Sequence, residues 1–190
     1  MNTLKNKLIS SLISVSILAF ISCKKDKDDV VPDHHNHNHN EEELITSLIL
    51  NFTDSANQSV VKTFAFRDPD GEGGNAPTQF DTIVLGANTT YLVSLSLLNE
   101  SVQPSVLISD EVLAEADEHL FCFENTGISI EIERTDSDGA YELGLESKWK
   151  TQNSGLGNVT IMLKHQPGVK DGSCSLGDTD VEVTFPVKVQ

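Results

Sequence analysis

The sequence predicts an all-β protein: an immunoglobulin-like antiparallel β-sandwich of about seven or eight strands, preceded by a cleaved signal and a disordered tether. Three observations predict this. From Leu44 onward, apolar residues recur at every second position, as in strands with one face on a core and one in water. Clusters of Gly, Asn and Asp separate these runs, as turns do. The 190 residues are 38% hydrophobic, which suffices for the core of a single domain.

Residues 1–22 have the features of a signal peptide. Lys5 and Lys7 give a positive start, and an apolar run interrupted only by serines extends from Leu8 to Phe20. That run is shorter than the roughly 20 residues of a membrane-spanning helix. We therefore expect a signal at 1–22, a tether at 23–40 and the sandwich at 41–190.

The end of this signal, Ala-Phe-Ile-Ser-Cys at residues 19–23, resembles the lipobox of bacterial lipoproteins. The resemblance implies cleavage before Cys23, a lipid thioether on its sulfur and acylation of the new amino terminus. Several acyl chains hold a protein on a membrane without a spanning segment. We expect an outer-membrane lipoprotein, with its periplasmic or surface exposure left open. An ordinary cleaved signal followed by a chance cysteine is the alternative.

The expected strands follow in order, each with its apolar residues on one face. A short helix with acids at its amino end is expected at Asp110 to Glu118. The strand-forming sets are Leu48, Leu50 and Phe52; Val60, Phe64 and Phe66; Tyr91, Val93, Leu95 and Leu97; Ile128, Ile130 and Ile132; Leu143, Leu145 and Trp149; Val159, Ile161, Leu163 and His165; and Val181, Val183, Phe185, Val187 and Val189.

Five segments together resemble a group of small lipoproteins from Bacteroidota. They are EEELIT (41–46) after an HHNHNH tether, FRDPDGEGGNAP (66–77), LLNES (97–101), ADEHLFCF (116–123) and TDVEVTFPVKV (179–189). The resemblance implies export and assigns no biochemical activity. Members are sometimes labelled as type 1 periplasmic binding fold proteins. That fold needs two domains of alternating strands and helices, whereas the strand pattern here predicts a sandwich.

Charge and motifs narrow the classes of function. Asp and Glu number 29 against 13 Lys and Arg, a net charge of −16, so charge attracts cationic partners and argues against nucleic acid. The sequence contains no GxSxG, HExxH or P-loop motif, and we expect no enzyme.

The tether carries the first candidate site. His34, His35, His37 and His39 place four imidazoles within six residues. Imidazole suits Zn²⁺ and Cu²⁺, and a flexible chain can wrap several nitrogens around one ion. An inert, solvated spacer is the alternative.

The second candidate is a calcium loop. Asp68, Asp70 and Glu72 stand at positions 1, 3 and 5 of DPDGEG, with Gly73 at position 6, as in the first half of an EF-hand loop. Position 12 is Gln79 rather than Glu, so an EF-hand is excluded. A shorter Ca²⁺ loop and a hairpin loop with solvated acids both remain open.

The third candidate is the pair His119 and His165. If their strands are neighbours, they can form a secondary metal site with Cys122 or Glu118; two hydrogen-bonded structural histidines are the alternative. Cys122 and Cys174 can form a disulfide in an oxidising compartment, or Cys122 can be a free core residue.

Two classes of function follow from these features. In the first, a membrane-anchored lipoprotein binds Zn²⁺ or Cu²⁺ through its His-rich tether and passes the ion to an outer-membrane importer such as a TonB-dependent receptor. In the second, a structural or adhesive surface sandwich binds Ca²⁺ or no metal, and its tether is only a spacer.

Overall fold

The computed structural model describes residues 43–71 and 73–190; the predicted signal peptide and tether lie outside them. Eight strands of five to twelve residues, three shorter strands and one helix make up this part of the chain. In order they are β1 (Ser47–Asp54), β2 (Val61–Arg67), β3 (Gln79–Phe80), β4 (Ile83–Leu85), β5 (Thr90–Asn99), β6 (Val106–Leu107), α1 (Ser109–Ala114), β7 (His119–Thr126), β8 (Ile130–Arg134), β9 (Glu146–Thr151), β10 (Gly155–His165) and β11 (Asp178–Val189).

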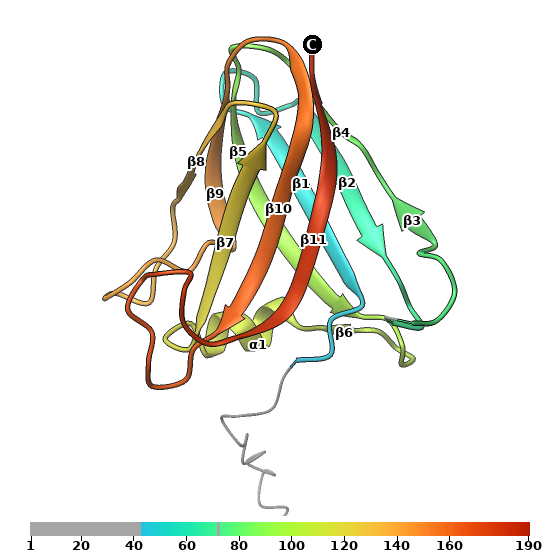
Figure 1. Cartoon of the computed structure of the whole chain (residues 1–190), viewed down its shortest axis with the longest axis vertical. Coiled ribbons are helices and arrows are strands. Elements are labelled where there is room, and N and C mark those ends of the chain that lie inside the picture. The colour runs from blue at the N-terminus through green and yellow to red at the C-terminus, as the bar shows by residue number, and fades with distance from the viewer. Residues whose placement is uncertain (1–42, 72) are drawn as a thin grey trace, which may run out of the picture. The chain divides into compact units, whose positions relative to one another are not determined.

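The strands form two sheets that face each other (Figure 1). One sheet has the order β3-β2-β1-β5-β9-β8, with β6 beside β5, and the other has the order β4-β11-β10-β7. The strand pairs are antiparallel except for the short parallel pair of β4 and β11. The predicted all-β sandwich is confirmed, and its eight longer strands agree with the number expected.

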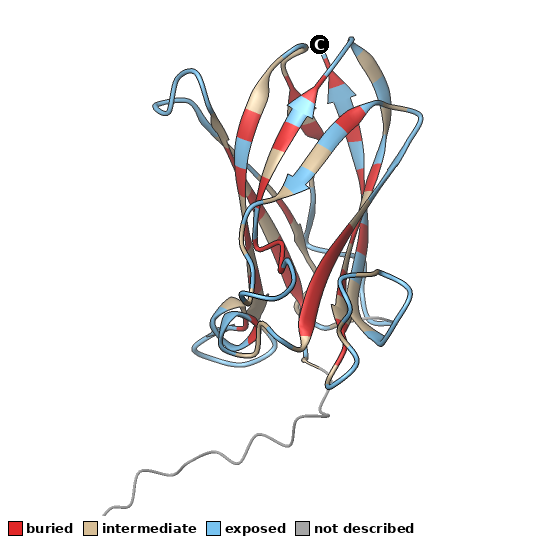
Figure 2. Ribbon diagram, turned by 90° about the vertical axis from the view of Figure 1, so that its left-hand side faces the viewer, coloured by how far each residue is buried: buried red, intermediate tan, exposed pale blue. Residues whose placement is uncertain are grey.

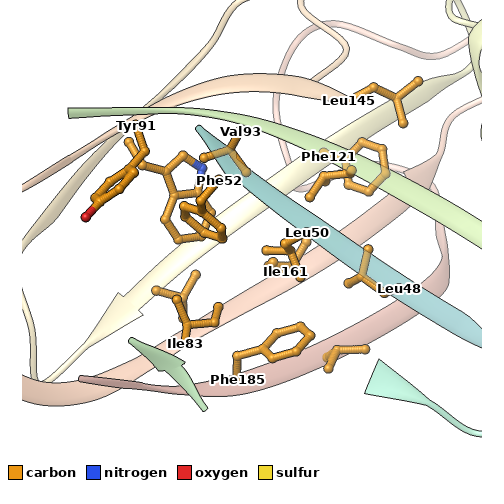
Figure 3. Packing of buried hydrophobic residues seen from close by; sticks show 14 of the residues in the cluster. Leu48, Leu50, Phe52, Ile83, Tyr91, Val93, Phe121, Leu145, Ile161 and Phe185 are labelled. Carbon is orange, nitrogen blue, oxygen red and sulfur yellow. The ribbon is translucent and has the colours of Figure 1, made fainter. Parts of the chain in front are cut away.

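The core lies between the sheets, because successive side chains of a strand point to opposite faces. Figure 2 shows buried and exposed residues alternating along the strands. Phe52 is one of the core residues in Figure 3; its ring makes edge contacts with Trp149 at 5.1 Å and Tyr91 at 5.8 Å between centroids. Such contacts add about 0.5–1.5 kcal/mol beyond the burial of apolar area.

Two segments differ from the expectation. Leu143 and Leu145 are buried, but they precede β9 rather than lie in it. Their carbonyls accept hydrogen bonds from Phe121 and Leu95, which fixes the segment without a continuous ladder. The helix α1 is also shorter than expected, since only turns follow Ala114.

A register shift in the second sheet changes the direction of one side chain. Leu163 of β10 pairs with Val181 of β11, but Lys164 pairs with Thr179. Asp180 is therefore the extra residue of a β-bulge. The strict alternation of β11 points its odd-numbered residues inward, which would turn Asp180 toward solvent. Because a bulge re-aims a side chain, the Asp180 carboxylate is instead fully buried.

The loop between β10 and β11 is fixed at several points. Cys174 in the loop and Cys122 of β7 form a disulfide across 52 residues of sequence. The buried Gln166 amide donates hydrogen bonds to the carbonyls of Ser173 and Leu176. Gly177 has φ +72°, and an added Cβ would lie 2.0 Å from the His165 carbonyl oxygen. Only glycine therefore allows this close approach at the loop's return.

A buried ion pair is the next anchor of the same loop. Lys170 Nζ lies 2.7 Å from both Asp138 Oδ2 and the Ala116 carbonyl oxygen. Burial alone would raise the pKa of Asp138. The hydrogen bonds from Lys170 and from the backbone of Tyr141 and Ala140 outweigh it and lower the pKa to about 2.

We expect Asp138→Asn to reduce the free energy of unfolding by about 2 kcal/mol at pH 7. The folded-state pKa lies below the ordinary value of 3.8, so this contribution is present above pH 3.8 and is lost as the pH falls toward 2. Urea unfolding at pH 7, 4 and 2.5 measures it, with the exposed Glu124→Gln as the control. A difference that stayed constant over this range would contradict the ion pair as its source.

Candidate metal centre

The sheet register brings the two ordered histidines together. His119 begins β7, His165 ends β10, and the two are direct partners in the ladder. Their rings are stacked, with centroids 4.8 Å apart and planes at 6°. They lie at the end of the sandwich where α1 lies (Figure 1). His119 and His165 are therefore neighbours, which the sequence alone did not decide.

Two carboxylates complete the group. His119 Nε2 lies 3.1 Å from Glu43 Oε1 and 3.7 Å from Asp180 Oδ2. His165 Nδ1 lies 4.0 Å from Asp180 Oδ1. One donor atom from each of Glu43, His119, His165 and Asp180 lies within 4.8 Å of the others. We call these four residues the His/carboxylate cluster.

The cluster is almost closed to solvent. The side chains of His119 and Asp180 are fully buried, and those of His165 and Glu43 are 8% and 9% exposed. Four titratable groups this deeply buried need mutual compensation or a bound ion, because an isolated charge is costly in such surroundings.

The His119 ring is held in the orientation of a metal ligand. Its Nδ1 lies 3.0 Å from the carbonyl oxygen of Glu115, just after α1. Since that carbonyl can only accept, Nδ1 is the donor and Nε2 faces the carboxylates. A ligating histidine commonly donates its second ring nitrogen in this way. Nε2 lies 3.1 Å from Glu43 Oε1, and through this contact the carboxylate acts on the ring.

The pKa shifts agree with an ion pair inside the cluster. Burial alone would lower the pKa of His119, but the hydrogen bond and charge of Glu43, with help from Asp180, raise it above its ordinary value of 6.5. Burial would raise the pKa of Glu43, but His119 lowers it below 4.5. Without a metal, the proton on His119 offsets part of the carboxylate charge.

The donor spacing suits a small divalent ion. A tetrahedral Zn²⁺ with bonds of about 2.0–2.2 Å places its ligand atoms about 3.3–3.6 Å apart. The 3.1 and 3.7 Å separations at His119 are close to this value. A metal lies in the plane of each imidazole that binds it, so the two parallel rings cannot both ligate one ion as they stand. His165 must tilt to join such a site; its Nε2 lies 3.7 Å from Glu118 Oε2, a predicted partner, and its Nδ1 lies 4.0 Å from Asp180 Oδ1.

A cavity of about 460 Å³ adjoins the cluster, with Asp180 in its lining. The described residues that line it are apolar, hydroxyl-bearing or acidic, apart from one glycine, and none of them is Lys or Arg. These residues are Ile45, Thr46, Phe66, Asp68, Gly71, Thr179, Asp180, Val181 and Glu182.

The other predicted sites have different outcomes. Cys23 and His34, His35, His37 and His39 lie outside the described residues, so their roles stay predictions. Cys122 is in the disulfide and is excluded as a metal ligand.

The predicted calcium loop connects β2 and β3, and its Glu72 lies outside the described residues. The Asp70 carboxylate accepts hydrogen bonds from the backbone and side chain of Asn75 at 2.9 and 2.6 Å. Desolvation and the neighbouring charge of Asp70 raise the pKa of Asp68 above its ordinary value. Asp70 therefore closes a turn, and calcium binding at this loop stays a prediction.

Sequence reasoning did not identify Glu43 or Asp180 as ligands. Glu43 stood out only as one of three acids after the tether. Asp180 precedes the alternating run of β11 by one residue. An acid at the end of such a strand is a weak signal, and the bulge that turns it inward has no mark in the sequence.

Neither a family model, nor a curated protein, nor a solved structure matches this chain. No helix within the described residues is long and apolar enough to span a membrane.

Proposed function

We propose that this protein binds a divalent transition-metal ion, with Zn²⁺ preferred, in the His/carboxylate cluster. The observation that supports this best is the convergence of two imidazoles and two carboxylates from four separate segments of the chain. The charges agree: two carboxylates and two neutral imidazoles balance a divalent cation, so the buried site becomes neutral when it is loaded.

The donor set favours zinc over the alternatives. Two nitrogens and two oxygens in a small site suit a four-coordinate Zn²⁺, whereas Ca²⁺ takes six to eight oxygens and Cu²⁺ prefers a square arrangement richer in nitrogen. The near absence of solvent favours holding the ion over catalysis, which needs an open coordination position.

The exported location and the tether are part of the same proposal. Lipidation at Cys23 would hold the protein on the outer membrane, and His34, His35, His37 and His39 would provide a second, weaker and more labile site for Zn²⁺ or Cu²⁺. A metal held this way can be delivered to an outer-membrane importer, with a TonB-dependent receptor as the expected partner. The disulfide supports an oxidising, exported location.

Isothermal titration with Zn²⁺ tests the cluster separately from the tether. We expect the parent to show a tight 1:1 site and weaker additional binding. The variant with all four tether histidines changed to Ala should keep the tight site and lose the weaker one. Affinity of the tight site should fall as the pH drops below the raised pKa of His119, since a proton competes with the metal for Nε2.

The opposite results have distinct meanings. If the tether variant binds no zinc, the tether rather than the cluster is the site. If neither protein binds near neutral pH, the metal function fails, and the structural or adhesive sandwich becomes the better explanation.

A further inference from the structure

We propose that divalent cations reach the buried cluster through the adjoining cavity, where Asp68 and Glu182 first capture the hydrated ion. This inference rests on the proposed metal function and adds an outer binding step to it. It is based on the cavity, on the acidic residues in its lining and on Asp180, which belongs both to that lining and to the cluster.

The cluster needs a route because its donors are closed to solvent. None of its four side chains is more than 9% exposed. The cavity meets the cluster at Asp180, the bulged residue of β11. The segment before β1 borders both, since Glu43 belongs to the cluster while Ile45 and Thr46 line the cavity.

The cavity is suited to a cation. Asp68, Asp180 and Glu182 are in its lining, and none of the described residues that line it is basic. Asp68 is partly buried, and its Oδ1 has no hydrogen-bond partner among the described residues, so its carboxylate can accept from the water shell of an incoming ion. A concave surface of one charge sign raises the local concentration of counter-ions and their association rate.

The two ends of the segment at residues 43–46 are held in different ways. Thr46 is held by backbone hydrogen bonds with Leu98 and Asp68 and by its hydroxyl, which accepts from the Glu100 amide. Among the described residues, the backbone hydrogen bonds from this segment to the first sheet begin at Thr46. Glu43, three residues earlier, is held by its contact with His119 Nε2 at 3.1 Å. The entering ion replaces this contact and takes the Glu43 carboxylate as a ligand.

The transfer is an exchange of ligands without oxidation or reduction. The ion leaves water and the outer carboxylates of Asp68 and Glu182, and bonds form to Glu43, Asp180, His165 and His119 Nε2. Any proton on His119 Nε2 is released to solvent.

Stopped-flow mixing with Co²⁺ tests this route, because the visible absorption of Co²⁺ rises when it enters a four-coordinate site. All proteins carry the four tether His→Ala changes, so that only the cluster is observed. We expect Asp68→Asn with Glu182→Gln to slow association at least 5-fold at low ionic strength. The equilibrium dissociation constant should change less than 2-fold, because both residues lie outside the cluster. The difference in rate should shrink at 1 M salt, where charges are screened beyond about 3 Å.

Glu131→Gln is the matched control. It removes one exposed carboxylate from β8, at the opposite edge of the sheet from the β2–β3 side that carries Asp68. Its association rate should equal that of the parent. Equal rates for the control and the Asp68/Glu182 variant would overturn the route while tight Co²⁺ binding still supported the metal site. Absence of tight binding in the parent would overturn both.

Discussion

Saturating zinc should raise the melting temperature of the parent protein by about 5–10 °C at pH 7.5. A ligand at 100 times its dissociation constant adds about 2.7 kcal/mol to the folded state, and each kcal/mol shifts the melting temperature by about 2–4 °C in a domain of this size. The effect follows from the need to neutralise Glu43 and Asp180, which are buried beside His119. Differential scanning calorimetry with and without Zn²⁺ measures it.

The zinc shift should disappear in Glu43→Gln/Asp180→Asn. The amides keep the shapes of the side chains but remove both charges that hold the metal, so the metal-free fold is kept. His119→Ala should also lose the shift, but it leaves two carboxylates without their cation, a change that costs about 3–5 kcal/mol. The amide variant is therefore the cleaner test. Glu131→Gln is the control that keeps the full shift, and a full shift in the amide variant would contradict the cluster as the site.

The stability of the metal-free parent should also depend on pH, because His119 and Glu43 form an ion pair that the amide variant lacks. In the metal-free parent, His119 has a raised pKa and Glu43 a lowered one. The His119 contribution is fully present below pH 6.5 and is lost as the pH rises through the raised value. The Glu43 contribution is present above pH 4.5 and is lost as the pH falls through the lowered value. The ion pair thus stabilises the metal-free protein most at pH values between the pKa of Glu43 and that of His119. The stabilisation by zinc should be largest above the pKa of His119, where the proton no longer offsets the carboxylate charge.

Removing the disulfide should cost about 4 kcal/mol of unfolding free energy. Closing a loop of this length, with Cys122 and Cys174 separated by 52 residues, restricts the unfolded chain by about that amount. We expect Cys122→Ala/Cys174→Ala to unfold at a much lower urea concentration than the parent. Equilibrium urea unfolding of both proteins without zinc measures the difference.

The disulfide variant should also bind zinc about 10-fold more weakly, an effect of the size seen when the groups that orient metal ligands are lost. Cys122 lies three residues after His119, and Cys174 lies in the loop that joins His165 to Asp180, so the bond holds three ligand-bearing strands in place. The parent treated with a dithiol reductant should behave like the variant. A change of less than 1 kcal/mol in the reduced parent would contradict a structural role for the bond.

The sequence determined the class of fold because the signal is local. A strand with one face on a core must alternate apolar and polar residues, and β1, β5, β10 and β11 do so along nearly their whole lengths. β7 was harder to recognise, since its first four residues are all buried. Cys122 in this segment is bonded to Cys174 of the β10–β11 loop, and that contact is not local.

The candidate site could be predicted only in part. The sequence offered His119 and His165 as potential ligands, because imidazole is a metal donor wherever it stands. Their pairing depends on the register of β7 against β10, and no residue within either strand fixes that register. The disulfide was equally open, since Cys122 and Cys174 belong to segments that only the folded chain brings together.

The sequence by itself determined the excess of acidic charge, the alternating strands and the chemical types of the candidate ligands, since each depends on residues close together in the chain. Only the tertiary structure decided which donors meet. Glu43 comes from the segment before β1, His119 from β7, His165 from β10, and Asp180 from a bulge that reverses the direction its position in β11 predicts. The physical reason is that strand pairing and bulges are set by packing between distant segments, so a site assembled from four of them leaves no pattern along the chain.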